Sequence, residues 1–416
     1  MEKEVVFTKE MARDYTILIP TMLPMHFKII AQIFSTYGYK AELLENVGQN
    51  VVDSGLKYVH NDTCYPALLV IGQFIDALES GKYDTHKVAL LLTQTGGGCR
   101  ASNYIALLRK ALIKAGYGYI PVISLNFSGL ESAPGFKITL PMLHRMVYGV
   151  FYGDLLMLLR NQCRPYEKNI GDTEKLCEKW TAKLVEEMKD KGVKYSRVKK
   201  NYKAIVEDFK NIPRTNETRV KVGIVGEIFV KFSPLGNNNL EDFLVAEGAE
   251  VSMPGLVDFC LYCAYNGVMD HKLYGTGAIK AKVWKIAFDF VVKKQNDLIR
   301  AIKENSDFTP PTPIEHTKSL IDGYIGFGTK MGEGWLLPAE MLELIDSGVK
   351  NIVCAQPFGC LPNHIVGKGM MKPIKERNPD VNIVAIDYDP GATKINQENR
   401  IKLMLSCAAD NLKKNG

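Results

Sequence analysis

The chain has 416 residues, of which 46% are hydrophobic and 24% are charged, close to an average soluble globular protein. This length predicts two or three domains with a sizeable core, and the composition excludes a disordered or fibrous chain. The net charge of +6 is small for the length. The one basic stretch, residues 183–203, has acids interleaved at helical spacing, so we interpret it as a solvated helix face and expect no nucleic-acid partner.

Three further features bear on the location of the protein. No apolar run reaches the roughly 18 residues that a membrane span needs. The N-terminal stretch MEKEVVFTKEMARDY lacks the apolar centre of a signal peptide. We therefore expect a cytoplasmic protein with no membrane partner. Nine cysteines in a reducing compartment then predict free thiols or metal ligands, not a disulfide framework.

Short apolar strands alternate with helical stretches in the first third of the chain, which is typical of an α/β fold with mainly parallel sheets. The strands are nearly all apolar, as expected for strands covered on both faces. Strands are predicted at 16–20, 40–44, 87–92 and 121–127. Helices are predicted at 26–37, 67–81 and 100–115.

The last third of the chain repeats this order after a helical middle. Residues 137–211 have apolar side chains at helical spacing, and another helix is predicted at 278–305. Strands are predicted at 221–225, 249–254, 351–355 and 382–388. Helices of the last third are predicted at 240–247 and 339–346.

The register of the repeat is close. Cys99 lies 22 residues before Pro121, and Cys360 lies 22 residues before Asn382. Each cysteine follows a glycine and sits where a strand gives way to a helix. We therefore predict an α/β protein with two related Rossmann/flavodoxin-like parallel-sheet lobes and a helical segment between them. The expected divisions are 1–134, 135–215 and 216–416, with a helical insertion at about 273–306.

Three cysteines occupy places where a ligand is expected. In parallel α/β sheets, ligands bind beyond the carboxyl ends of the strands, near helix N-termini. Cys99 and Cys360 lie at such junctions, and Cys64 in NDTCYP also precedes a helix. A thiolate there is stabilised by the helix dipole and by backbone N–H groups. Three thiolates between two lobes suit a 4Fe–4S cluster with one open iron.

The other cysteines are predicted to be structural, as buried small apolar side chains. Cys354 is the rival third ligand, but it aligns with Thr93 inside a strand, which favours the core. Cys260 and Cys263 form a CxxC pair in an apolar helical stretch, with no second pair at zinc-like spacing, so core packing is favoured there too. The remaining three are Cys163, Cys177 and Cys407.

Six segments resemble the iron–sulfur module at the C-terminal end of large activase-related proteins. That module is related to the subunits of 2-hydroxyglutaryl-CoA dehydratase and to double-cubane cluster proteins, and the likeness runs over nearly the whole chain. The spacing of 35 residues from Cys64 to Cys99, with Cys360 much later, resembles the ligand pattern of the dehydratases. The segments are NDTCYP, TQTGGGCRASNY, NNNLEDFLVAEGAEV, GEGWLLPAEM, PFGCLPNH and IDYDPGATKINQENRIKL.

The resemblance implies an oxygen-sensitive iron–sulfur enzyme, a 2-hydroxyacyl-CoA dehydratase-like lyase or a low-potential reductase component. In the dehydratases, a separate ATP-hydrolysing activator delivers one low-potential electron. The electron passes to the thioester of a 2-hydroxyacyl-CoA, and the resulting ketyl radical expels the hydroxyl group. For this chain we expect a 4Fe–4S cluster on Cys64, Cys99 and Cys360, an activator acting in trans, a CoA-thioester substrate, and a homo- or heterodimer.

Two alternatives remain open. In the first alternative, the protein is a double-cubane reductase of small molecules, and its 8Fe–9S cluster needs six ligating cysteines. Cys354 and one or two of the other cysteines would then become ligands. In the second alternative, the protein is a non-catalytic cluster carrier or assembly partner for another enzyme.

Overall fold

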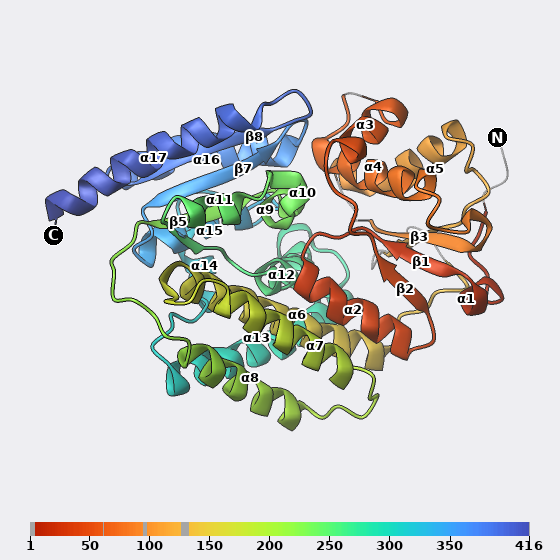
Figure 1. The fold of residues 1–416 in the computed structure, drawn as a ribbon, viewed down its shortest axis with the longest axis horizontal. Helices are drawn as coiled ribbons and strands as arrows, with labels where there is room; N and C mark the ends of the chain where they lie inside the picture. The colour runs from red at the N-terminus through yellow and green to blue at the C-terminus, as the bar shows by residue number, and fades with distance from the viewer. Residues whose placement is uncertain (1–4, 61, 95–97, 126–132, 416) are drawn as a thin grey trace.

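The computed structural model describes residues 5–60, 62–94, 98–125 and 133–415. Two sheets of four strands each, all of them parallel, lie in separate lobes. In Figure 1 the N-terminal lobe is at the right, the C-terminal lobe is at the upper left, and a layer of helices lies below both. The predicted α/β class with two parallel-sheet lobes and helices between them is confirmed. Among the described residues, no helix is both long enough and apolar enough to cross a membrane.

The sheet of the N-terminal lobe has the order β2-β1-β3-β4. All four strands were predicted, although residues 126–127 of the last prediction lie outside the described residues. The strands are β1 (Thr16–Ile19), β2 (Lys40–Leu43), β3 (Val88–Thr93) and β4 (Val122–Leu125). Its helices are α1 (Met11–Asp14), α2 (Pro24–Thr36), α3 (Gln49–Tyr58), α4 (Tyr65–Glu79) and α5 (Tyr104–Lys114), with the 3₁₀ turns η1 (Thr85–Lys87) and η2 (Arg100–Asn103).

Helix α3 was not predicted, and its glycine explains why. A glycine inside a short polar segment ordinarily weakens a helix. Here Gly55 allows a close crossing, since a Cβ at this position would lie 2.5 Å from the carbonyl oxygen of Leu68 in α4. Gly72 in α4 has the same role, because its Cβ would lie 2.1 Å from the carbonyl oxygen of Val51. Tertiary packing therefore forms this helix despite its low propensity.

The sheet of the C-terminal lobe has the order β6-β5-β7-β8, so it repeats the order of the first sheet strand for strand. Its strands are β5 (Lys221–Gly226), β6 (Glu250–Ser252), β7 (Asn351–Pro357) and β8 (Asn382–Tyr388). Its helices are α9 (Ile228–Phe232), α10 (Pro234–Asn237), α11 (Leu240–Ala246), α14 (Ile314–Leu320), α15 (Leu336–Asp346), α16 (Gly369–Arg377) and α17 (Lys394–Asn415), with the π-helical turn η4 (Asn363–Lys368) before α16.

Five longer helices form the layer that joins the lobes (Figure 1). The predicted helical middle divides into three of them, and the helix predicted at 278–305 has those bounds in the structure. The buried apolar side chains of the protein form more than one core. A large share of one of these cores lies in this layer, where Tyr152, Tyr202 and Phe209 are fully buried. The five are α6 (Leu140–Cys163), α7 (Asp172–Glu187), α8 (Tyr195–Lys210), α12 (Leu256–Tyr274) and α13 (Ala278–Asn305).

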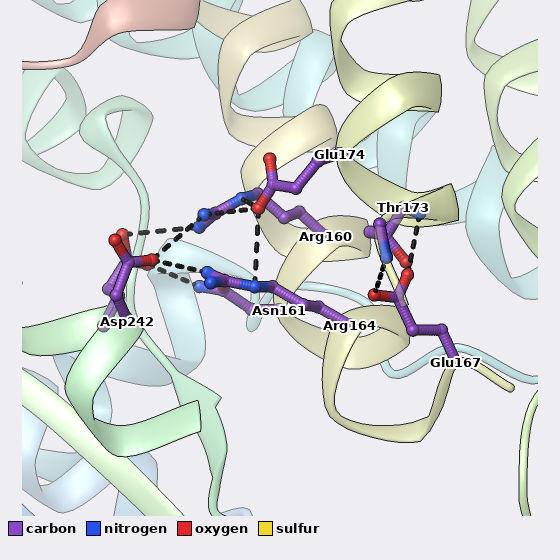
Figure 2. Close-up of polar contacts among 9 residues, drawn as sticks. Arg160, Asn161, Arg164, Glu167, Thr173, Glu174 and Asp242 are labelled. Atoms are coloured by element: carbon purple, nitrogen blue, oxygen red, sulfur yellow. Dashed lines mark hydrogen bonds and ion pairs between the residues drawn. The ribbon is translucent and has the colours of Figure 1, made fainter. Parts of the chain in front are cut away.

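An ionic network fixes the C-terminal lobe on this layer. Figure 2 shows Arg160 of α6 and Arg164, the residue directly after this helix, next to carboxylates of α7 and α11. The Arg160 guanidinium lies 2.6 Å from Glu174 of α7, and Arg164 lies 2.6 Å from Asp242 of α11. Arg160 is only 15% exposed, so its ion pair with Glu174 is screened less by water than an ordinary surface ion pair.

Candidate functional site

The three predicted ligand cysteines each lie just before a helix. Cys64 occupies the N-cap position of α4, and Cys99 occupies that of the 3₁₀ turn η2. Cys360 lies three residues after the end of β7, directly before the helical segment that leads into α16. All three therefore sit beyond the carboxyl end of a sheet or at a helix N-terminus, as the sequence predicts. Residues 95–97 of the turn before Cys99 lie outside the described residues.

The loop that carries Cys360 lies directly against Cys64. The backbone N–H of Tyr65 donates to the carbonyl oxygen of Phe358 at 3.0 Å, across the two lobes. Gly359 has a φ of +71°, and a Cβ at this position would lie 3.1 Å from the Cα of Cys64. Glycine is therefore needed here both for its backbone conformation and for the close approach.

The loop that carries Cys99 contacts the segment before Cys64 and a loop of the C-terminal lobe. The guanidinium of Arg100 donates to the carbonyl oxygen of Asp62, in the segment before Cys64. The backbone N–H of Gly98 donates to the thioether sulfur of Met331 at 3.0 Å. Met331 belongs to a loop of the C-terminal lobe at residues 326–334 (GFGTKMGEG), which we call the glycine-rich loop. The three loops therefore meet at one place between the lobes, which we call the three-thiol junction (Cys64, Cys99 and Cys360).

Burial raises the pKa of all three thiols. Cys64 is 4% exposed and Cys360 is 7% exposed. The pKa of Cys99 rises to about 11 because of burial and then because of the charges of Glu333, Cys64 and Glu227. Burial, followed by the charges of Glu333 and Glu227, also raises the pKa of Cys360, and the charge of Cys99 contributes as well. The thiols are thus close enough to influence one another's ionisation.

Local donors act in the opposite direction. The backbone N–H groups of Ala67, Ala101 and Asn363, two or three residues after each cysteine, lower the pKa values of the three thiols. The hydroxyl of Tyr104 lies 3.0 Å from the sulfur of Cys64 and lowers its pKa too. Cys64 and Cys360 are buried and Cys99 is half-buried, yet each thiol is provided with donors that favour a thiolate. A bound cation would stabilise the thiolate forms further, in the direction in which the charge of Arg100 already acts on Cys64.

Cys354 lies elsewhere, as predicted from its alignment with Thr93. It is fully buried within β7, where it pairs in register with Ala385 of β8. Its thiol donates to the side-chain oxygen of Asn363 at 4.0 Å. Burial raises its pKa to about 12. Cys163 and Cys177 are also buried, again as predicted.

The core placement predicted for Cys260 and Cys263 is wrong, because both side chains are exposed. They lie three residues apart in α12 and so share one face of the helix. The buried face is formed by Leu261, Tyr262 and Ala264. Although Cys263 is exposed, protein atoms crowd around its thiol. The loss of solvation that they cause, together with the charge of Glu333, raises the pKa of Cys263 to about 12. The structural role predicted for Cys407 is also wrong, since this residue is exposed on α17.

Two carboxyl groups at the three-thiol junction were not predicted. Glu227 directly follows the last residue of β5, and Glu333 lies in the glycine-rich loop before α15. They are only 8% and 7% exposed. For Glu227, one feature of the sequence could have indicated a functional role, namely its position directly after a central strand of a parallel sheet. His364, four residues after Cys360, contacts the side-chain amide of Gln356.

The donor set suits an iron–sulfur cluster chemically, because buried thiols with N–H donors are the surroundings in which such clusters are ligated. No three His, Cys, Asp or Glu side chains in the described parts of the chain are arranged to hold a single metal ion. A cluster needs a wider arrangement, since each thiolate binds a different iron. A cavity of about 840 Å³ lies between α2, α7 and α11, and none of the three thiols lines it.

Comparison with protein-family models and with curated proteins finds no match for the chain.

Proposed function

We propose that this protein is an iron–sulfur enzyme of the 2-hydroxyacyl-CoA dehydratase type. The observation that supports this proposal best is that the loops of Cys64, Cys99 and Cys360 meet at one place between the lobes, where two of the three thiols are buried. These residues come from distant parts of the chain, and each lies before a helix. Packing alone does not require thiols at all three positions, whereas cluster ligation does.

The residues of the chain have separate roles in this proposal. Cys64, Cys99 and Cys360 hold a 4Fe–4S cluster, and its bound form supplies one low-potential electron and an open iron for the substrate. Tyr104 donates to the Cys64 sulfur, which stabilises the thiolate and tunes the site through a ligand. The glycine-rich loop contacts Gly98, the residue before Cys99, from the opposite lobe through Met331.

The proposed partners follow from this chemistry. A separate ATP-hydrolysing activator provides the electron in trans, and the substrate is a CoA thioester. We further propose a cytoplasmic location and a homo- or heterodimer.

Anaerobic reconstitution of the full chain with iron and sulfide tests the proposal. We expect about four irons per chain, the content of one cubane. Addition of a 2-hydroxyacyl-CoA should change the EPR signal of the reduced cluster, because the substrate approaches an open iron. A colourless, iron-free protein after reconstitution would contradict the proposal. A loaded cluster that no CoA thioester perturbs would instead favour a carrier or assembly partner.

The second candidate is a double-cubane reductase of small molecules. The exposure of Cys260 and Cys263 favours it, because these two thiols join Cys64, Cys99 and Cys360 as candidate ligands. Cys354 is then the sixth cysteine that such a cluster needs, but its complete burial within β7 weighs against that role. About eight irons per chain would favour this candidate, and about four would dismiss it.

A further inference from the structure

Two buried carboxyl groups are held on one turn of the chain at the three-thiol junction. Glu227 caps the short helix α9, where its Oε2 accepts from the backbone N–H of Val230 at 2.9 Å. Glu333 reaches the same turn from the glycine-rich loop, and its Oε1 accepts from the backbone N–H of Ile228 at 3.0 Å. Among the described residues, no side chain is hydrogen-bonded to either carboxyl group.

The charge balance around this pair is incomplete. Lys231 is the cation on α9, but its ammonium lies 2.9 and 3.0 Å from the two carboxylate oxygens of Glu340. Lys231 and Glu340 are each 3% exposed and form a buried ion pair, whose two charges act on the pKa of Glu333 in opposite directions. No ion pair to Glu227 or Glu333 is present in the described parts of the chain. Two neighbouring carboxylates in a buried site do not both stay ionised without such a partner.

The pair lies beside the thiol loops, because the loop of Glu333 contacts Gly98 through Met331 and a Cβ at Gly332 would lie 2.9 Å from Pro362. The charges of both carboxyl groups raise the pKa values of Cys99 and Cys360, and the charge of Glu227 acts on Cys64 as well. Burial and then the charge of Glu333 raise the pKa of Glu227 to about 8. Burial also raises the pKa of Glu333. Two buried carboxyl groups that accept from the same turn and have no cation partner therefore favour a shared proton, next to the place where the substrate would react.

We propose that Glu227 and Glu333 form a proton-sharing carboxyl pair that serves as the acid and then the base of the reaction at the three-thiol junction. This role rests on the proposed dehydratase function. The C–O bond of the 2-hydroxyl group breaks while the carboxylic acid gives its proton to the leaving oxygen, so that water departs. The resulting carboxylate then takes a proton from carbon 3 of the substrate, which restores the pair. The electron supplied by the activator is returned, so water and the unsaturated thioester are the only products.

The first test needs neither a cluster nor a substrate. Infrared spectra of the iron-free full chain, recorded over a pH titration, should contain a protonated-carboxyl band that disappears as the pH rises through about 8. Glu227→Gln and Glu333→Gln should each remove or shift this band. Glu343→Gln is the matched control: Glu343 is also a buried glutamate, but it is hydrogen-bonded to Thr317 and its own band should disappear nearer pH 7, so this substitution should leave the component near pH 8 unchanged. A band that neither substitution at the pair alters would overturn the proposal.

The second test uses the reconstituted protein with its activator and a 2-hydroxyacyl-CoA. Removal of a general acid–base group typically lowers the rate about 10²–10⁴-fold, so we expect such a loss of kcat in Glu227→Gln with iron content and EPR signal unchanged. Glu333→Asp keeps a carboxyl group and should retain more activity than Glu333→Gln, which guards against a misfolded variant. Full turnover by both glutamine variants would overturn the catalytic role. Failure of the wild type to load iron would refute the proposed function, and with it this role, while the infrared result would still decide whether the pair exists.

Discussion

Gly359 lies against the backbone of Cys64, so two lobes that are far apart in the sequence touch at the residue that carries a predicted ligand. A Cβ at position 359 would lie 3.1 Å from the Cα and 3.3 Å from the backbone nitrogen of Cys64. The contact joins the C-terminal end of β7 to the N-terminus of α4. The relative position of Cys64 and Cys360 is thus set by backbone packing and not by their side chains alone.

Gly359→Ala should therefore weaken the three-thiol junction. The substitution adds a methyl group at a φ of +71° and presses it against Cys64, and strain of this kind costs about 1–3 kcal/mol. We expect a lower free energy of unfolding and a lower iron content after reconstitution. Gly348→Ala is the control, because Gly348 has a φ of +86° but open space around it. Equal iron loading in the two variants would show that the contact is unimportant for the site.

The identity of the ligand cysteines can be tested by substitution. Serine at Cys64, Cys99 or Cys360 should abolish cluster loading, because a thiolate ligand is lost. Alanine at Cys354 should leave the iron and sulfide content near that of the wild type, since only a small buried volume changes in β7. Loss of iron in Cys354→Ala, with full loading in Cys360→Ser, would reverse the assignment of the third ligand.

Cys260→Ala and Cys263→Ala separate the two candidate functions. A single cubane on the three-thiol junction does not use these exposed thiols, so we expect an unchanged content of about four irons per chain in both variants. Cys407→Ala is a control, because that thiol is exposed on α17. An iron content of about eight per chain in the wild type, together with a fall to about four in Cys260→Ala or Cys263→Ala, would favour the double-cubane reductase.

Local patterns in the sequence predicted the sheets and most of the layer, because buried parallel strands and long helices depend mainly on nearby residues. Helix α3 was missed because its formation depends on the close approach of Gly55 to α4. Cys260 and Cys263 were misplaced because an apolar stretch does not tell which face of α12 is covered. The meeting of Glu227 with Glu333 was also out of reach, since it depends on how the glycine-rich loop folds back onto α9.

The buried pair of Lys231 and Glu340 gives a prediction about stability. Lys231→Met leaves Glu340 buried without its cation, a change that typically costs about 3–5 kcal/mol. The double variant Lys231→Met/Glu340→Leu should recover most of this loss, because no unpaired charge remains. Lys221→Met is the control, since Lys221 is 48% exposed and its pair with Glu250 should contribute about 1 kcal/mol or less. Urea unfolding of the four proteins measures these differences, and a double variant as unstable as Lys231→Met would contradict the explanation.

Glu343 makes stability depend on pH. Burial and then the charge of Glu340 raise its pKa to about 7, from an ordinary value of 4.5. Asp258 and Lys231 are the other charged groups that act in this region, and the hydroxyl of Thr317 donates to Glu343 at 3.1 Å. A carboxyl group whose pKa is raised in the folded protein stabilises it fully below about pH 4.5, and this stabilisation is lost as the pH rises through about 7.

Glu343→Gln should remove this part of the pH dependence, because an amide does not ionise and still accepts the hydrogen bond from Thr317. Relative to the variant, the wild type should lose roughly 2–3 kcal/mol of unfolding free energy between pH 5 and pH 8. Urea unfolding of both proteins at several pH values measures the difference. Glu304→Gln, at an exposed position of α13, should follow the wild type throughout. A constant difference between wild type and Glu343→Gln across this range would mean that Glu343 is ionised in the folded protein even at pH 5.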